Sequence, residues 1–85
     1  MGQVSEPGVP GRLKWQCRRG MLELDVLLGR FVENRWSTLD ESLKQEFEDL
    51  LNFSDQQLQQ WLCEGREADE KVRKIARTIR AEDDN

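Results

Sequence analysis

Histidine and tyrosine are absent from this chain of 85 residues, and cysteine and proline occur only twice each. Without histidine, the chain lacks the imidazole that zinc sites often use and the usual base for activating a serine or cysteine nucleophile. A glycine-rich phosphate-binding loop is also missing from the sequence. We therefore expect a protein that is not an enzyme and that has no metal site.

Long hydrophobic runs and paired cysteines are missing as well. No apolar segment approaches the roughly 20 residues that a transmembrane helix needs, so we expect no direct membrane insertion. Cys17 and Cys63 lie far apart in the sequence, and the simplest interpretation is two reduced cysteines packed on helix faces. A disulfide or a redox role is the alternative that this pattern leaves open.

What the chain does have is apolar residues at helical spacing in every segment after Gly11. The length suits a single small domain with a modest core. Together these features predict an all-α fold, a compact bundle of about five short helices over residues 12–80. We interpret residues 1–11 as a flexible N-terminal arm and residues 81–85 as a disordered acidic tail.

Two of the helices are predicted to meet at Gly20. The first covers residues 12–19, and the glycine then interrupts it. The second starts at Met21, and its apolar residues follow the i, i+3, i+4 and i+7 spacing of a core-facing helix. These apolar residues are Leu24, Leu27, Leu28 and Phe31. We also expect Trp15 to pack inward, as aromatic residues at helical spacing usually do.

Capping-box patterns predict where the next two helices begin. Thr38 with Glu41 marks the third helix, and Ser54 with Gln57 marks the fourth. Gly65 is expected to end the fourth helix. The predicted core residues of the last three helices are Leu39, Leu43, Phe47, Leu50, Leu58, Trp61, Leu62, Val72, Ile75, Ala76 and Ile79.

Charge is unevenly distributed along the chain. Residues 11–36 carry six basic and three acidic side chains, whereas residues 37–70 carry two basic and ten acidic ones. The basic clusters near both ends suggest nucleic-acid binding as one alternative function. The formal net charge of −4 disfavours that alternative, so we expect no nucleic-acid partner.

The segment from Arg18 to Asp25 concentrates charge at the predicted helix junction. Arg19 and Glu23 are four residues apart, so they can pair if the helical path continues through Gly20. The missing side chain at Gly20 would let another backbone approach closely. One interpretation is a docking surface that offers a positively charged side chain, a negatively charged side chain and an accessible stretch of backbone between them. The other is an ordinary surface ion pair beside a glycine that bends the chain.

Residues on both sides of this segment complete a longer signature. Its first part consists of Arg12, Trp15, Cys17, Arg18, Arg19, Gly20, Met21, Glu23, Leu24, Asp25 and Phe31. Its second part consists of Leu50, Leu51, Asp55, Leu58, Trp61, Leu62 and Gly65. This signature resembles that of the FAD assembly factors of succinate dehydrogenase, a family with an Arg-Gly-x-x-Glu (RGxxE) motif. The departures from the family pattern, at Trp36, Gln56 and Glu67, lie away from the motif.

The resemblance implies a helper protein that binds the flavoprotein subunit of succinate dehydrogenase, and in bacteria also that of fumarate reductase. It would promote covalent attachment of FAD to this client without binding FAD stably itself. The partner-binding residues that it implies are Arg19, Gly20 and Glu23, supported by Arg18, Asp25 and Arg12.

We expect this helper to be a monomer when free. A bacterial cytoplasmic location is expected, because the N-terminal arm has no mitochondrial targeting pattern. A small helical regulator, of the nucleic-acid-binding or antitoxin-like type, is the alternative function.

Overall fold

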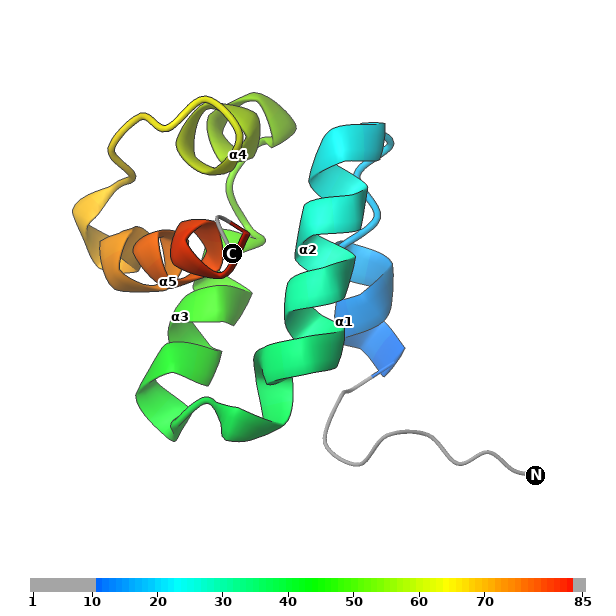
Figure 1. The fold of residues 1–85 in the computed structure, drawn as a ribbon, viewed down its shortest axis with the longest axis vertical. Helices are drawn as coiled ribbons and strands as arrows, with labels where there is room; N and C mark the ends of the chain where they lie inside the picture. The colour runs from blue at the N-terminus through cyan, green and yellow to red at the C-terminus, as the bar shows by residue number, and fades with distance from the viewer. Residues whose placement is uncertain (1–10, 84–85) are drawn as a thin grey trace.

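The computed structural model describes residues 11–83, which form five α-helices joined by short segments (Figure 1). The helices are α1 (Gly11–Gln16), α2 (Leu22–Arg35), α3 (Glu41–Leu50), α4 (Asp55–Leu62) and α5 (Arg73–Asp83), with 3-10 turns η1 (Trp36–Thr38) and η2 (Glu70–Val72). This range contains no strand, which confirms the predicted all-α bundle. Of the N-terminal arm predicted for residues 1–11, residues 1–10 lie outside the described residues, and Gly11 is the first residue of α1. The last two residues of the predicted tail also lie outside the described residues.

Helix α5 lies at the centre of the bundle, where it contacts α2, α3 and α4. Figure 1 shows α5 between α3 and α4, with the long helix α2 beside it and α1 on the other side of α2. Ile75, Ala76 and Ile79 of α5 are buried, as predicted, and so is Val72 of the preceding η2 turn. Because each fully buried isoleucine contributes about 1.5–3 kcal/mol, this short helix supplies a large share of the core.

The apolar stripe predicted for α2 is buried, from Leu24 to Phe31. The prediction that Trp15 packs inward is wrong, since its side chain is 74% exposed. The buried residues here are Leu13 of α1 and Cys17, which directly follows the helix. At about 100° per residue, position 15 lies on the opposite side of α1 from both. The other tryptophan predicted to be in the core, Trp61, is buried.

The start of α4 confirms the capping box, whereas the start of α3 differs from the prediction. The Gln57 N–H donates to Ser54 Oγ at 3.1 Å, and the Ser54 N–H donates to Gln57 Oε1 at 3.2 Å. Helix α3 is capped by Asp40, whose Oδ1 accepts the Leu43 N–H at 2.8 Å. Thr38 lies in η1, and its hydroxyl donates to the Arg35 carbonyl. The predicted capping box at Thr38 is therefore wrong.

Gly65 and the end of α5 define the remaining boundaries. Gly65 has a φ of +80°, and the following Arg66 N–H donates to the Gln60 carbonyl at 2.9 Å, so the chain folds back over the end of α4. Residues 81–83 are helical, beyond the predicted helix end at residue 80. An ion pair between Glu82 and Arg35 ties this last turn to α2. None of the helices in residues 11–83 has the length and apolar character that a membrane span requires.

The two candidate caps of α3 give a direct test of this boundary. Replacing Asp40 by alanine removes the hydrogen bond to the Leu43 N–H, so we expect the free energy of unfolding to fall by about 1 kcal/mol. Thr38→Ala removes a hydroxyl outside the helix, and we expect a loss of at most about 0.5 kcal/mol. Urea denaturation followed by circular dichroism measures both, and a larger loss for Thr38→Ala would contradict the assignment of the cap.

Candidate functional site: the turn between α1 and α2

The chain reverses direction between α1 and α2 over residues 17–21. The Arg18 N–H donates to the Trp15 carbonyl, and Gly20 adopts a φ of +87°, which residues with a side chain rarely adopt. Helix α1 therefore ends at Gln16, three residues before the predicted end at Arg19. The helical path does not continue through the glycine, so Arg19 and Glu23 do not share one helix face.

The i, i+4 spacing suggested that Arg19 pairs with Glu23, but the two residues do not pair. The Arg19 Nε donates to Asp55 Oδ1 at 2.8 Å, which forms an ion pair across the bundle. Its two terminal nitrogens donate to the carbonyls of Gln16, Leu51 and Phe53 at 2.9–3.0 Å. The side chain is 15% exposed. Arg19 is therefore an internal clamp between this turn and the segment that follows α3.

Asp25 holds the backbone of the same turn. Its two carboxylate oxygens accept the N–H groups of Arg19 at 2.7 Å and Gly20 at 3.1 Å. It lies in the first turn of α2, where negative charge also complements the helix dipole. Asp25, predicted as a supporting partner contact, thus has an internal role as well.

Gly20 itself is exposed, and a Cβ atom added there would meet nothing within 4 Å. Space is therefore open at this point, as the predicted docking surface required. The positive φ is a separate constraint, because any other residue would strain the turn.

The exposed side chains around the turn include apolar residues that were not predicted as site residues. Trp15, Leu22 and Val26 are 74%, 81% and 46% exposed. We define the turn face as these three residues together with the exposed charges of Arg18 and Glu23. The sequence carried a signal for two of them, because Leu22 and Val26 are apolar positions outside the buried stripe of α2.

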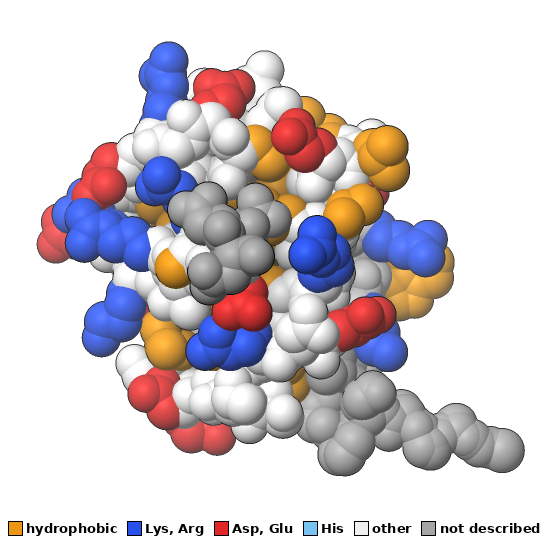
Figure 2. All heavy atoms as spheres, viewed as in Figure 1, with side chains coloured by type: hydrophobic (Ala, Val, Ile, Leu, Met, Phe, Trp, Pro, Cys, Tyr) orange, Lys and Arg blue, Asp and Glu red, His pale blue; other side chains and the backbone are white. Residues whose placement is uncertain are grey.

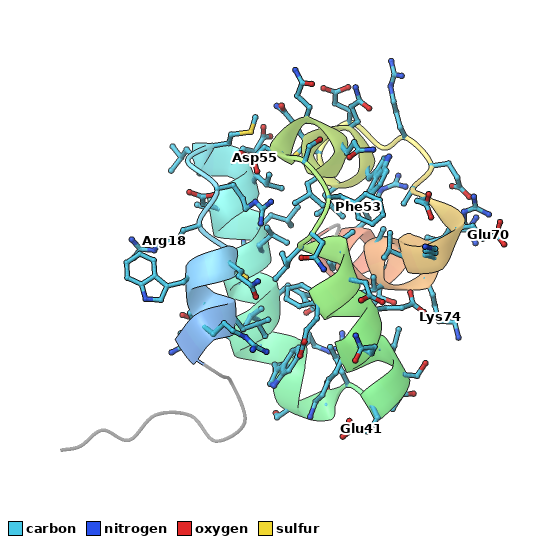
Figure 3. The ribbon with its side chains drawn as sticks, turned by 180° about the vertical axis from the view of Figure 1, so that it is seen from behind. Arg18, Glu41, Phe53, Asp55, Glu70 and Lys74 are labelled. Carbon is cyan, nitrogen blue, oxygen red and sulfur yellow. The ribbon has the colours of Figure 1, made fainter. Side chains whose placement is uncertain are left out.

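The turn face is continuous over the start of α2. The Arg18 guanidinium lies 5.9 Å from the centre of the Trp15 ring. Val26 lines a hollow of about 390 Å³ between α1 and α2, which Arg18 also lines, and a second of about 470 Å³ between α2 and α4, which Leu22 and Glu23 line. Figure 2 shows hydrophobic side chains beside charged ones over this end of α2, and Figure 3 shows Arg18 pointing outward from the end of α1.

Glu23 is the predicted site residue that is most available to a partner. It is exposed, and its side chain forms no hydrogen bond or ion pair with any residue in the range 11–83. Arg12, by contrast, lies in the first turn of α1 and pairs with Glu48 of α3 at 3.7 Å. The structure therefore brings Arg18, Arg19, Gly20, Glu23 and Asp25 together, with Arg12 at the opposite end of α1.

Cys17 lines the hollow between α1 and α2 but is not suited to nucleophilic chemistry. Burial raises the pKa of its thiol from 9.0 to about 11; the nearby Arg19 acts against this shift and Asp25 adds to it. The thiol therefore stays protonated near neutral pH. Neither cysteine forms a disulfide, and residues 11–83 contain no cluster of three or more side chains suited to a metal ion.

Comparison with known proteins places this geometry in a family. Residues 11–83 match the family described as Sdh5, flavinator of succinate dehydrogenase. The chain belongs to this family. It is 40% identical over 77 residues to the FAD assembly factor SdhE of Coxiella burnetii (strain RSA 493 / Nine Mile phase I), a match that covers 85% of this chain and 94% of the relative.

A second relative gives the same result. The FAD assembly factor SdhE of Legionella pneumophila (strain Paris) is 42% identical over 69 residues, which cover 81% of this chain and 87% of the relative. Family membership thus extends over nearly the whole described chain, including the α1–α2 turn and the α3–α4 segment that Arg19 joins to it.

Substitution of Arg19 should affect the fold more than substitution of its exposed neighbour. Arg19→Ala leaves a half-buried carboxylate and three carbonyls without their donor, so we expect the free energy of unfolding to fall by about 3 kcal/mol. Arg18→Ala changes an exposed side chain, and we expect a change within about 0.5 kcal/mol. Chemical denaturation of the two variants measures the difference in unfolding free energy. Equal losses in the two variants would show that the internal hydrogen bonds of Arg19 do not contribute to stability.

The raised pKa of Cys17 predicts a pH dependence of stability. The unfolded thiol ionises near pH 9.0 and the folded one near 11. Its contribution is therefore fully present below pH 9 and is lost as the pH rises from 9 to 11. We expect the difference in unfolding free energy between the unsubstituted protein and Cys17→Ala to decrease over this interval. If this difference in unfolding free energy has equal values at pH 8 and pH 11, the prediction is contradicted.

Proposed function

We propose that this protein is an FAD assembly factor that binds the flavoprotein subunit of succinate dehydrogenase and promotes covalent attachment of FAD to it. The observation that carries the proposal is the family match over residues 11–83. The two relatives described above are both named FAD assembly factor SdhE, which supports the same activity.

The client contact surface in this proposal is the turn face together with the exposed backbone at Gly20. An exposed group of apolar side chains with polar residues at its edge is typical of a protein interface, and aromatic residues and arginine are enriched there. Trp15 and Arg18 belong to the residue types that contribute most to binding energy. Glu23 offers an acceptor to a donor on the client, and Gly20 allows the client backbone to approach closely.

The helper acts by binding in this proposal, because the turn face holds no activated nucleophile. The covalent bond forms between FAD and a histidine of the client, and the helper stabilises the client conformation in which the two are aligned. A bound protein shifts such an equilibrium only by its greater affinity for one state. FAD is the substrate of this reaction on the client and is not held stably by the helper.

We extend the proposal to three further properties. The flavoprotein subunit of fumarate reductase is a second client, the helper is a monomer when free, and it acts in the bacterial cytoplasm. The bacterial source of the relatives supports the location.

The nucleic-acid-binding alternative has weaker support in the structure. Its second basic cluster lies in η2 and α5 and consists of Lys71, Arg73, Lys74, Arg77 and Arg80. Two of these residues, Arg73 and Arg77, pair with Glu67. A phosphate backbone would have to displace these ion pairs.

Glu23 gives the sharpest test of the contact surface. Glu23→Gln removes the charge of an exposed residue, so we expect stability to change by less than about 0.5 kcal/mol while affinity for the client falls about tenfold. The matched control is Glu70→Gln, which removes an exposed charge from η2. The measurements are binding to purified client lacking FAD and covalent FAD in the client, detected by in-gel flavin fluorescence.

The possible outcomes distinguish an error in the proposed function from an error in the proposed contact surface. If deletion of the gene leaves flavin fluorescence of the client subunit unchanged, the proposed function is wrong. If deletion abolishes fluorescence but Glu23→Gln binds the client as well as Glu70→Gln does, the function stands and the assignment of Glu23 is wrong.

A further inference from the structure

The guanidinium of Arg19 has little capacity left for a partner. A guanidinium carries five N–H donors, and four of them are used by Asp55 and the carbonyls of Gln16, Leu51 and Phe53. With 15% of its side chain exposed, Arg19 would have to give up internal hydrogen bonds to bind a client directly.

These hydrogen bonds join two segments that are distant in sequence. The Gln16 carbonyl is at the end of α1, whereas those of Leu51 and Phe53 follow α3. Carbonyls at a helix end have no partner within the helix, so Arg19 supplies donors that the backbone cannot. Figure 3 shows Phe53 in the segment between α3 and α4, and Asp55 at the start of α4.

Asp55 supplies the only negative charge in direct contact with this guanidinium in residues 11–83. It is the first residue of α4, but the capping hydrogen bonds there belong to Ser54 and Gln57. Its Oδ1 is therefore available to Arg19, and the Asp55 side chain is 45% exposed. Without the carboxylate, a largely buried positive charge would be held by neutral carbonyls alone, which favours its movement into water.

Residue 19 is thus fixed twice, through its side chain by Asp55 and through its N–H by Asp25. Its neighbours in sequence are Arg18, which belongs to the turn face, and Gly20, where the backbone is exposed. Release of the Arg19 side chain would leave the turn held by Asp25 alone, and this looser attachment would change where Arg18 and Gly20 are presented.

We infer that Asp55 is a positioning residue for flavinylation, which acts by holding Arg19 and thereby fixing the turn face in the geometry that the client binds. This inference rests on the proposed function. Asp55 does not touch the client in this mechanism. Arg19 likewise acts from inside the protein, although it belongs to the motif that the resemblance assigns to partner binding.

The experiment compares Asp55→Asn with Glu41→Gln. Asp55→Asn keeps an oxygen acceptor for the Arg19 Nε but removes the charge. Glu41 occupies the equivalent first position of α3, after the cap at Asp40, so Glu41→Gln controls for loss of charge near a helix N-terminus. Both variants are assayed at a temperature where circular dichroism shows them fully folded, and Asp55→Glu tests rescue by a restored carboxylate.

Two readouts distinguish positioning from stability alone. The first is the rate of covalent FAD formation on purified client lacking FAD. The second is amide hydrogen exchange at Arg19 and Gly20, compared with amides in α5. We expect Asp55→Asn to lower the rate at least fivefold and to speed exchange at the turn but not in α5, Asp55→Glu to recover most of the rate, and Glu41→Gln to match the unsubstituted protein.

Each contrary outcome has a defined meaning. If the unsubstituted protein stimulates flavinylation and folded Asp55→Asn is equally active, the inference is overturned while the proposed function stands. Equal loss of activity in Glu41→Gln would also overturn it. If the unsubstituted protein fails to stimulate flavinylation, the proposed function and this inference both fall.

Discussion

The ion pair between Arg19 and Asp55 joins parts of the chain that helix formation alone would leave independent. Helix α1 has six residues, too few to be stable by itself in water. Burial of Leu13 and Cys17 packs it on the core, and Arg19 then fixes the turn that follows it to the segment after α3. The exposed start of α2 is consequently held in a fixed position relative to the core.

Most of the fold could be predicted from the sequence because helical spacing records which face is buried. The stripes of α2 and α5 followed from that spacing. The start of α3 did not, since Thr38 and Asp40 are both capping residues two positions apart, and only the η1 turn decides between them. The exposure of Trp15 was missed because an aromatic residue was assumed to pack inward, although its position relative to Leu13 and Cys17 pointed outward.

The candidate site was harder to predict, because its central contact is not local. The i, i+4 spacing of Arg19 and Glu23 suggested a pair, but that rule holds only along a continuous helix. The positive φ of Gly20 breaks the helix. The actual partner of Arg19 is 36 residues away, and no periodicity connects the two positions. Local spacing therefore singled out this segment but gave the wrong partner for Arg19 within it.

The surroundings of the three RGxxE residues show that each has a different structural role. Arg19 is largely buried and uses four N–H donors internally, Gly20 provides a backbone conformation, and Glu23 alone presents an exposed side chain. A loss of function at any of the three would look the same in an assay of flavinylation, yet the physical causes would be a loosened turn, a strained turn and a lost contact. Contact with a client therefore cannot be assigned to a motif residue from activity alone. It requires that the folded turn be intact in the variant, a condition that Glu23 variants meet most readily because that side chain supports nothing else in residues 11–83.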